Sequence, residues 1–132
     1  MSANNHFVEH LIIDGYGCSS FLLNNKNKIA GLIDAIIEAT DMKQLSEIHL
    51  YEVEGVPNTK DTGGVTGIVV INESHISIHT FPNREYVSID IFTCKNGLDV
   101  EKIVRLCKFS LEIKECDTSL IKRGLHFPKE DI

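Results

Sequence analysis

The sequence contains no tryptophan, and it has little proline, little methionine and few basic residues. Its longest uninterrupted run of apolar side chains, Ile68–Ile71, is far shorter than the roughly 20 residues that a membrane-spanning helix needs. It does not open with the basic, apolar and small-residue pattern of a secretory signal. The 13 Lys and Arg residues are outnumbered by 19 Asp and Glu residues, and the net charge of −6 disfavours binding to nucleic acid. We therefore expect a protein that engages no nucleic acid and no membrane.

Cysteines are also few, and their spacing argues against two of their common uses. No Cys-x-x-Cys pair is present, which leaves a structural zinc site with little support. Four cysteines in a chain without a secretory signal favour reduced thiols over a disulfide framework. The sequence therefore predicts a cytoplasmic protein with no metal site, whose free thiols are Cys18, Cys94, Cys107 and Cys116.

The rest of the composition is that of an ordinary globular protein. Hydrophobic residues make up 42% of the 132 positions and charged residues 24%, far from the composition of a disordered chain. Internal repeats, low-complexity tracts and long linkers are missing. We expect a single domain over residues 1–132.

Apolar periodicity predicts the element order β-α-β-β-β-β-α-β. This order has six strands, one more than the five β-rich segments, and the position of the additional strand boundary is not assigned. Two segments have apolar residues at helical spacing, and Asn24 or Asn25 can cap the first of them. The predicted helices are Asn24–Thr40 and Leu98–Leu111, a loop is expected over Val56–Gly64, and the β-rich segments are Phe7–Tyr16, Glu47–Val53, Val65–Phe81, Val87–Thr93 and Glu112–Ile121.

The turn residues between the β-rich segments indicate the fold class. Pro82 and Asn83 separate Val65–Phe81 from Val87–Thr93, which predicts an antiparallel hairpin. Hairpin connections favour an antiparallel sheet, and two amphipathic helices can cover one of its faces. The predicted fold class is therefore α+β, a two-layer sandwich with an antiparallel sheet and two helices on one face.

The segment Asn72–Thr80 is unusually polar for a strand so close to the centre of the pattern. If the strand is regular, alternation places the side chains of Glu73, His75, Ser77 and His79 on one face, whereas a bulge near Ser74 would change this assignment. The isoleucines at positions 76 and 78 then face the core.

Three interpretations of this segment compete on the residues alone. It can be the solvated face of an edge strand, which is the usual meaning of such a pattern. His75 and His79 can instead bind a metal, although no third ligand stands at a diagnostic spacing. Finally, Ser74 can act as a nucleophile with a nearby histidine as base, but the Gly-x-Ser-x-Gly motif of the α/β-hydrolases is absent.

A resemblance to a known family changes the balance between these interpretations. The segment Gly64–Pro82 resembles the processing-site block of the prokaryotic S-adenosylmethionine decarboxylases, and its Glu-Ser-His-x-x-Ile-His-Thr core is highly specific. Further matching segments follow the family's order and spacing; they are His10–Cys18, Asp90–Cys94 and the pair Arg123-Gly124.

This resemblance implies a pyruvoyl-dependent decarboxylase of polyamine (spermidine) biosynthesis that is made as an inactive precursor. The Ser74 hydroxyl would attack the Glu73 carbonyl, and elimination from the resulting ester would divide the chain into residues 1–73 and 74–132. Ser74 would become a pyruvoyl group, which forms a Schiff base with the amine of S-adenosylmethionine and delocalises the electrons left by carbon dioxide.

The resemblance also implies a role for several side chains. His79 matches the base that completes processing, and a histidine with a pKa near neutrality suits that role. Cys94 matches the proton donor of the decarboxylation. Thr66 stands where serine is common, and it keeps a hydroxyl that can support processing. His75 matches no chemical role, and we interpret it as structural.

Substrate binding is where the sequence departs from the family pattern. Asn83 stands where many members have a glutamate that binds the substrate ribose, and Glu85 is a nearby substitute. The loop Glu54–Gly64 is longer than usual and lacks the common His-x-Phe-x-Pro-x-Gly pattern. Tyr51 is then the candidate for stacking on adenine.

These departures leave two alternatives open. A pyruvoyl-dependent decarboxylase of the same fold could act on arginine or a similar amino acid, because the Ser74, His79 and Cys94 set serves only the α-amino-acid part of a substrate. An unprocessed paralogue could instead regulate an active partner, although the intact set argues against this. By resemblance, we also expect a homo-oligomer, at least a dimer.

Overall fold

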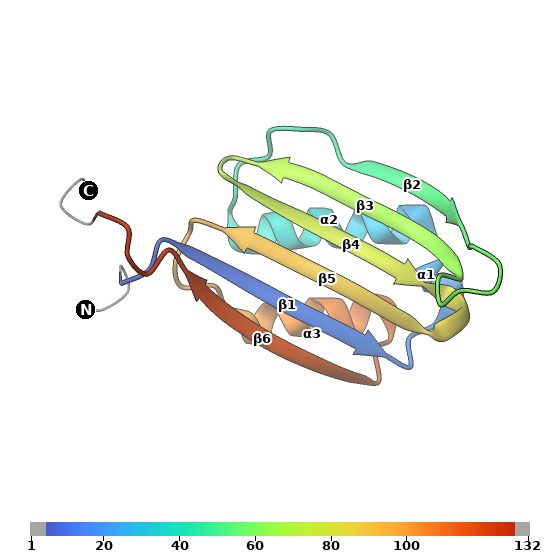
Figure 1. Ribbon diagram of the computed structural model, residues 1–132. Coiled ribbons are helices and arrows are strands. Elements are labelled where there is room, and N and C mark those ends of the chain that lie inside the picture. Colours follow the sequence, from blue (N-terminus) through green and yellow to red (C-terminus); the bar gives the residue numbers. More distant parts are fainter. Residues whose placement is uncertain (1–4, 129–132) are drawn as a thin grey trace.

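The computed structural model describes residues 5–128 and has a single six-stranded sheet in the order β2-β3-β4-β5-β1-β6 (Figure 1). Every neighbouring pair of strands is antiparallel. The strands are β1 (Val8–Tyr16), β2 (His49–Glu54), β3 (Gly63–Ile71), β4 (Ser74–Phe81), β5 (Tyr86–Thr93) and β6 (Glu115–Arg123).

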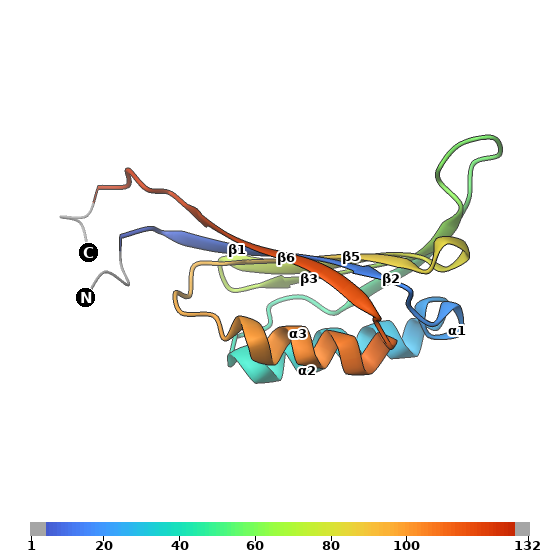
Figure 2. The same cartoon turned by 90° about the horizontal axis from the view of Figure 1, so that it is seen from below.

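The helices cover one face of this sheet and leave the other face without a helical layer (Figure 2). We call these the helix face and the open face. This arrangement confirms the predicted α+β fold with two long helices on one face of an antiparallel sheet. The helices are α1 (Ser20–Leu23), α2 (Lys26–Thr40) and α3 (Val100–Leu111), and a 3₁₀ turn, η1, spans Pro82–Arg84.

The core lies between the helix face and the two long helices, as the apolar stripes predict. The α2 stripe buries Ile29, Leu32, Ile33 and Ile36, and Cys107 is fully buried on α3. The first stripe begins after Asn25, whose side-chain oxygen accepts a hydrogen bond from the Lys28 N–H group at 3.2 Å and caps α2. The alternating isoleucines of β4, Ile76 and Ile78, are completely buried, as expected.

One prediction about the polar segment is wrong. The β-rich stretch Val65–Phe81 is divided by a two-residue turn at Asn72-Glu73, since Ile71 pairs with Ser74. Glu73 therefore does not share a strand face with His75, Ser77 and His79. Its φ of 61° is in the left-handed region, which lets the chain reverse there without glycine or proline.

Other boundaries differ in smaller ways. The helix predicted over Asn24–Thr40 begins at Lys26 and is preceded by the short α1, which the apolar pattern does not predict. Strand β2 is an edge strand that is exposed at all but one position. In the segment predicted over Glu47–Val53, Ile48 and Leu50 pack against the core while the side chains between and after them are exposed. The last strand begins at Glu115 rather than Glu112, because α3 ends in a left-handed cap at Glu112.

Among residues 5–128, no helix combines the length and the apolar character needed to cross a membrane.

Candidate active site

The predicted cleavage site lies at one end of the sheet, where the β3–β4 turn meets the end of β5 (Figure 1). Ser74 is the first residue of β4, and Cys94 directly follows β5. The antiparallel pairing of β4 with β5 brings these two residues together although 20 positions separate them in the chain.

The atoms of the Glu73–Ser74 bond have partners from the end of β5. The Cys94 thiol donates to the Glu73 carbonyl oxygen at 3.3 Å, and the Cys94 N–H group donates to Ser74 Oγ at 3.4 Å. Ser74 Oγ in turn donates to Thr93 Oγ1 at 3.3 Å. The serine hydroxyl and the carbonyl that precedes it are thus held by one short segment, residues 93–94.

The environment of Cys94 keeps its thiol protonated. Burial, and to a smaller extent the negative charge of Glu73, raise the pKa of Cys94 above its ordinary value of 9.0. A protonated thiol can donate a hydrogen bond to a carbonyl and can serve as a general acid.

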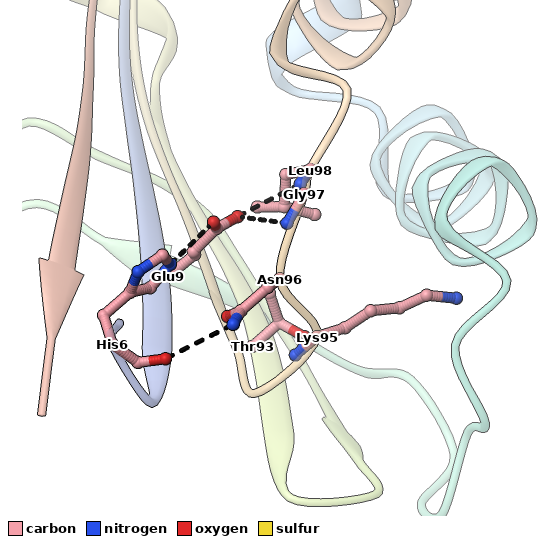
Figure 3. A network of polar contacts seen from close by, with 7 residues as sticks. All are labelled: His6, Glu9, Thr93, Lys95, Asn96, Gly97 and Leu98. Atoms are coloured by element: carbon pink, nitrogen blue, oxygen red, sulfur yellow. Dashed lines mark hydrogen bonds and ion pairs between the residues drawn. The ribbon is translucent and has the colours of Figure 1, made fainter. Parts of the chain in front are cut away.

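The loop that follows Cys94 is fixed by a buried carboxylate on β1 (Figure 3). Glu9 Oε1 accepts hydrogen bonds from the N–H groups of Gly97 at 3.1 Å and Leu98 at 3.0 Å. Its other oxygen lies 2.9 Å from His6 Nε2, and both side chains are buried. Lys95 adds a second anchor, because its ammonium group donates to the carbonyl at the end of α2, at Thr40, at 2.8 Å.

His79 and Thr66 form a second group, away from the first. The Thr66 hydroxyl and His79 Nδ1 are hydrogen-bonded at 3.2 Å across the β3–β4 pair. His79 is five residues from Ser74 on a regular strand, which corresponds to a separation of about 16 Å. An odd separation also places the two side chains on opposite faces. His79 cannot reach Ser74 within the same chain.

A cavity of about 670 Å³ surrounds this second group. One wall is the segment between β2 and β3, which rises from the sheet on the side away from the helices (Figure 2). The floor is the open face, where the rings of Phe81 and Tyr86 stack at 5.5 Å. Its polar and charged lining includes Lys60, Asp61, Thr66, His79, Arg84 and Ser88.

The predicted substrate-binding residues lie outside this cavity within a single chain. Asn83 lines two smaller hollows, one beside α1 and one beside β2, and Tyr51 is 57% exposed on the edge strand. Glu85 has a left-handed φ of 52° at the end of η1, and its carbonyl accepts a hydrogen bond from the Cys18 N–H group. Arg84, which lies between Asn83 and Glu85, is the residue of this turn that faces the cavity.

The remaining candidates have structural surroundings. The ring of His75 stacks on Phe92 on the open face with centroids 5.0 Å apart, which agrees with a structural role. Cys18 and Cys107 are buried, and burial raises their pKa values to about 11 and about 12, so both remain neutral thiols in the core.

Comparison with known proteins places this geometry in a family. The sequence profile of S-adenosylmethionine decarboxylase matches residues 9–124. The S-adenosylmethionine decarboxylase proenzyme of Clostridium botulinum (strain Hall) is 35% identical over 116 residues, covering 87% of this chain and 92% of that protein. This chain belongs to the S-adenosylmethionine decarboxylase family.

A further relative agrees with this membership, and a solved structure shares the fold. The S-adenosylmethionine decarboxylase proenzyme of Caldicellulosiruptor saccharolyticus is 34% identical over 88% of this chain and 87% of its own length. The crystal structure of the adenosylmethionine decarboxylase from Aquifex aeolicus VF5 has the same fold, with a TM-score of 0.73, 24% identity and coverage of 90% of this chain and 92% of that chain.

The region shared with the S-adenosylmethionine decarboxylase family contains both groups of site residues, since it extends from Glu9 to Gly124. Sequence reasoning missed two features of the site. The segment Asp90–Cys94 was identified for its cysteine, but Thr93 also contacts Ser74. The cavity residues Lys60 and Arg84 were also missed, because they lie in a loop and a turn, where no periodic pattern identifies the residues that line a cavity.

Proposed function

We propose that this decarboxylase is made as a precursor that cleaves itself between Glu73 and Ser74 and then decarboxylates S-adenosylmethionine. The observation that carries the proposal is the contact of both reacting groups with the end of β5. The thiol of Cys94 donates to the carbonyl that is attacked, and Ser74 Oγ is held beside it. A hydrogen-bond donor on this oxygen stabilises the negative charge that develops there during attack.

The backbone at the scissile bond also favours the reaction. A non-glycine residue with positive φ is strained by roughly 1–2 kcal/mol, and Glu73 has a φ of 61°. Cleavage after Glu73 releases this constraint. Ser74 Oγ would displace the Ser74 nitrogen from the Glu73 carbonyl carbon, and the hydroxyl proton would pass to that nitrogen. His79 would then remove the α-proton of Ser74, and Glu73 would leave as a carboxylate. The dehydroalanine left at position 74 would tautomerise to an imine, and water would hydrolyse the imine to the pyruvoyl group with release of ammonia.

The residues around Ser74 fit the pyruvoyl group that this sequence of steps produces. Such a group supplies the carbonyl that binds the substrate amine and accepts the electrons released with carbon dioxide. Cys94 lies within hydrogen-bond distance of the Glu73–Ser74 peptide and keeps its proton, so it can return a proton to the substrate carbon. No lysine from this chain is needed to hold the group, because it is part of the backbone.

We infer that the working enzyme is a dimer in which His79 of one chain serves Ser74 of the other. His79 lies about 16 Å from Ser74 in its own chain and on the opposite face of β4. The open face carries His79 and has no helical cover (Figure 2), so a second copy can pack there. A two-fold arrangement would bring the β3–β4 turn of each chain to the cavity of its partner.

Paired inactive variants test both cleavage and its dependence on a second chain. Ser74→Ala cannot cleave, and His79→Ala lacks the base. When the two are produced together, mixed dimers should cleave the His79→Ala chain, because its Ser74 meets an intact histidine. Mass spectrometry under denaturing conditions would show residues 1–73 and a second chain without a free α-amine.

The matched control pairs His79→Ala with a chain that carries both Ser74→Ala and His79→Ala. This pair should remain uncleaved. An uncut His79→Ala chain in isolated mixed dimers would show that the histidine acts within its own chain. If the natural protein itself stays as one chain, the self-cleavage proposal is wrong and the regulatory alternative gains support.

The cavity favours S-adenosylmethionine over a short basic amino acid. Its volume of about 670 Å³ lies in the usual range for ligands of nucleoside size. Its floor offers the stacked rings of Phe81 and Tyr86, against which an adenine can pack. Release of labelled carbon dioxide should therefore be at least ten-fold faster from S-adenosylmethionine than from arginine at equal concentration. The reverse order would favour the arginine decarboxylase alternative.

We place the enzyme in the cytoplasm. The support is the state of its thiols, since all four cysteines are free in the structure and two of them are buried in the core.

A further inference from the structure

We propose that Thr93 is a catalytic residue of self-cleavage, because its hydroxyl aims Ser74 Oγ at the Glu73 carbonyl carbon. This inference rests on the proposed cleavage of the Glu73–Ser74 bond. Ser74 Oγ donates to Thr93 Oγ1 at 3.3 Å, and among residues 5–128 this is the side chain that contacts the nucleophilic oxygen directly.

Thr93 is a polar exception in an apolar row. The side chains of β5 that face the helices are Val87, Ile89 and Ile91, all completely buried. Thr93 continues this alternation and is only 1% exposed. Packing alone would favour another valine or isoleucine here, since a buried hydroxyl is unfavourable unless it is hydrogen-bonded. Its hydroxyl accepts hydrogen bonds from a backbone N–H group and from the serine that has to react.

The hydroxyl of Thr93 is itself fixed in position. Thr93 Oγ1 also accepts a hydrogen bond from the Lys95 N–H group at 2.9 Å. The Glu9 carboxylate holds the next residues of the loop, Gly97 and Leu98 (Figure 3). A rigid acceptor of this kind restricts the rotation of the Ser74 side chain about χ1.

Two hydrogen bonds then fix the direction from which Ser74 Oγ can attack. The hydroxyl proton points at Thr93, and one lone pair accepts from the Cys94 N–H group at 3.4 Å. One lone pair remains for the Glu73 carbonyl carbon. Threonine is not a base at neutral pH, so its contribution is orientation. In the step it assists, the Oγ–C bond forms, the C–N bond of the peptide breaks, and the hydroxyl proton ends on the Ser74 nitrogen.

Substitutions at Thr93 separate the hydroxyl from the packing. Thr93→Val keeps the volume and removes the acceptor, whereas Thr93→Ser keeps the acceptor and removes a methyl group. We expect Thr93→Val to slow conversion of freshly synthesised precursor to two chains by about 10- to 100-fold, the usual scale for lost alignment of reacting groups. Thr93→Ser should remain within about three-fold of the natural rate.

Thr40→Val is the matched control. Thr40 is also buried, and its hydroxyl donates to the Ile36 carbonyl of its own helix at 2.7 Å. Its backbone carbonyl, which accepts from the Lys95 ammonium group, is kept in the variant. This variant loses a buried threonine hydroxyl without touching Ser74, so its precursor should mature at the natural rate. Melting temperatures of the precursors, measured with Ser74→Ala added to each, would show that all variants fold.

A second measurement isolates the step that Thr93 assists. In a His79→Ala background the ester cannot be eliminated, and hydroxylamine cuts the ester that has formed. The rate of hydroxylamine-dependent cleavage should fall when Thr93→Val is added to His79→Ala. If the valine variant does not fold, Thr93→Ala takes its place. It should be restored with Thr93→Ser.

The outcomes distinguish this inference from the function on which it rests. A natural maturation rate in Thr93→Val would overturn the role of Thr93. Equal slowing in Thr93→Ser and Thr93→Val would also overturn it, because the effect would then come from packing rather than from the hydroxyl. A natural protein that never divides into two chains would overturn the proposed function instead.

Discussion

Cys94 is placed to act in both halves of the proposed chemistry. Its thiol donates to the Glu73 carbonyl oxygen in the precursor, and the same proton is available to a substrate carbon after cleavage. Burial in the core raises the pKa values of Cys18 and Cys107 to about 11 and about 12, and no reacting group can reach them there. Under the proposed mechanism, Cys94 has a chemical role and the two core cysteines have structural ones, and burial distinguishes them.

Replacement of Cys94 should separate maturation from turnover. Cys94→Ala removes the donor to the Glu73 carbonyl but leaves Ser74 Oγ and its partners, so some precursor should still divide. Decarboxylation by the processed variant should fall by about 10²- to 10⁴-fold, the usual contribution of a positioned general acid. The initial rate of carbon dioxide release per processed chain measures this.

Cys116→Ala is the control for that measurement, because Cys116 packs at the edge of the core and contacts neither Glu73 nor Ser74. Misdirected protonation should also leave the substrate amine on the second chain of Cys94→Ala, visible as a mass change after turnover. Natural rates in processed Cys94→Ala would assign proton donation to another residue.

At the scale of elements, the buried carboxylate of Glu9 on β1 holds the loop that connects β5 to α3. Burial alone would raise the pKa of Glu9, but hydrogen bonds from Leu98, His6 and Gly97 outweigh it and set the pKa below the ordinary value of 4.5. The ionised form is thus favoured in the folded protein. Its contribution to the free energy of unfolding is complete above pH 4.5 and is lost as the pH falls through the lower folded value.

Glu9→Gln should reduce the dependence of the free energy of unfolding on pH in the acid range. We expect the uncleavable Ser74→Ala precursor to lose stability between about pH 5 and pH 3, and the added Glu9→Gln change to reduce that loss. Denaturant unfolding at several pH values measures it. Glu101→Gln is the control, because Glu101 is almost fully exposed on α3 and should leave the profile unchanged. Parallel profiles for Glu9→Gln and its parent would contradict this account.

The elements that periodicity could predict are those with a buried stripe. The apolar spacing of α2 and α3 and the alternation in β4 and β5 reflect burial against one core, so their faces were predictable. The division at Asn72-Glu73 was not, because the turn contains no glycine or proline and lies between two β-rich segments. The turn removes Glu73 from the expected strand face, and Ser74 lies beside Thr93.

The candidate site was predictable only as a set of residues. Ser74, His79 and Cys94 follow from the resemblance of their motifs, but their spatial separation does not. The separation of Ser74 from His79 is implicit in the strand predicted over Asn72–Thr80, because five residues of a strand span about 16 Å. The cavity residues Lys60 and Arg84 belong to irregular segments, whose side chains follow from tertiary contacts rather than from a local pattern.

At the scale of the whole molecule, the two faces of the sheet have different roles. The helix face is closed by α2 and α3 and contains the core (Figure 2). The open face carries apolar side chains that remain partly exposed, among them Ile68 at 38% and Val70 at 47%. Exposed apolar groups on the same face as an incomplete catalytic set are what an interface between copies requires.

Placing a charge on the open face should therefore stop both association and maturation. Ile68→Glu lies on β3, on the same face as Thr66, and contacts no reacting group, so any loss of cleavage would come from loss of the partner. We expect this variant to sediment as a monomer and to remain one chain. Phe109→Glu is the control, since Phe109 is 86% exposed on α3, and it should stay dimeric and cleave at the natural rate. A monomeric Ile68→Glu that still matures would show that one chain contains a complete site, and the dimer inference would then be wrong.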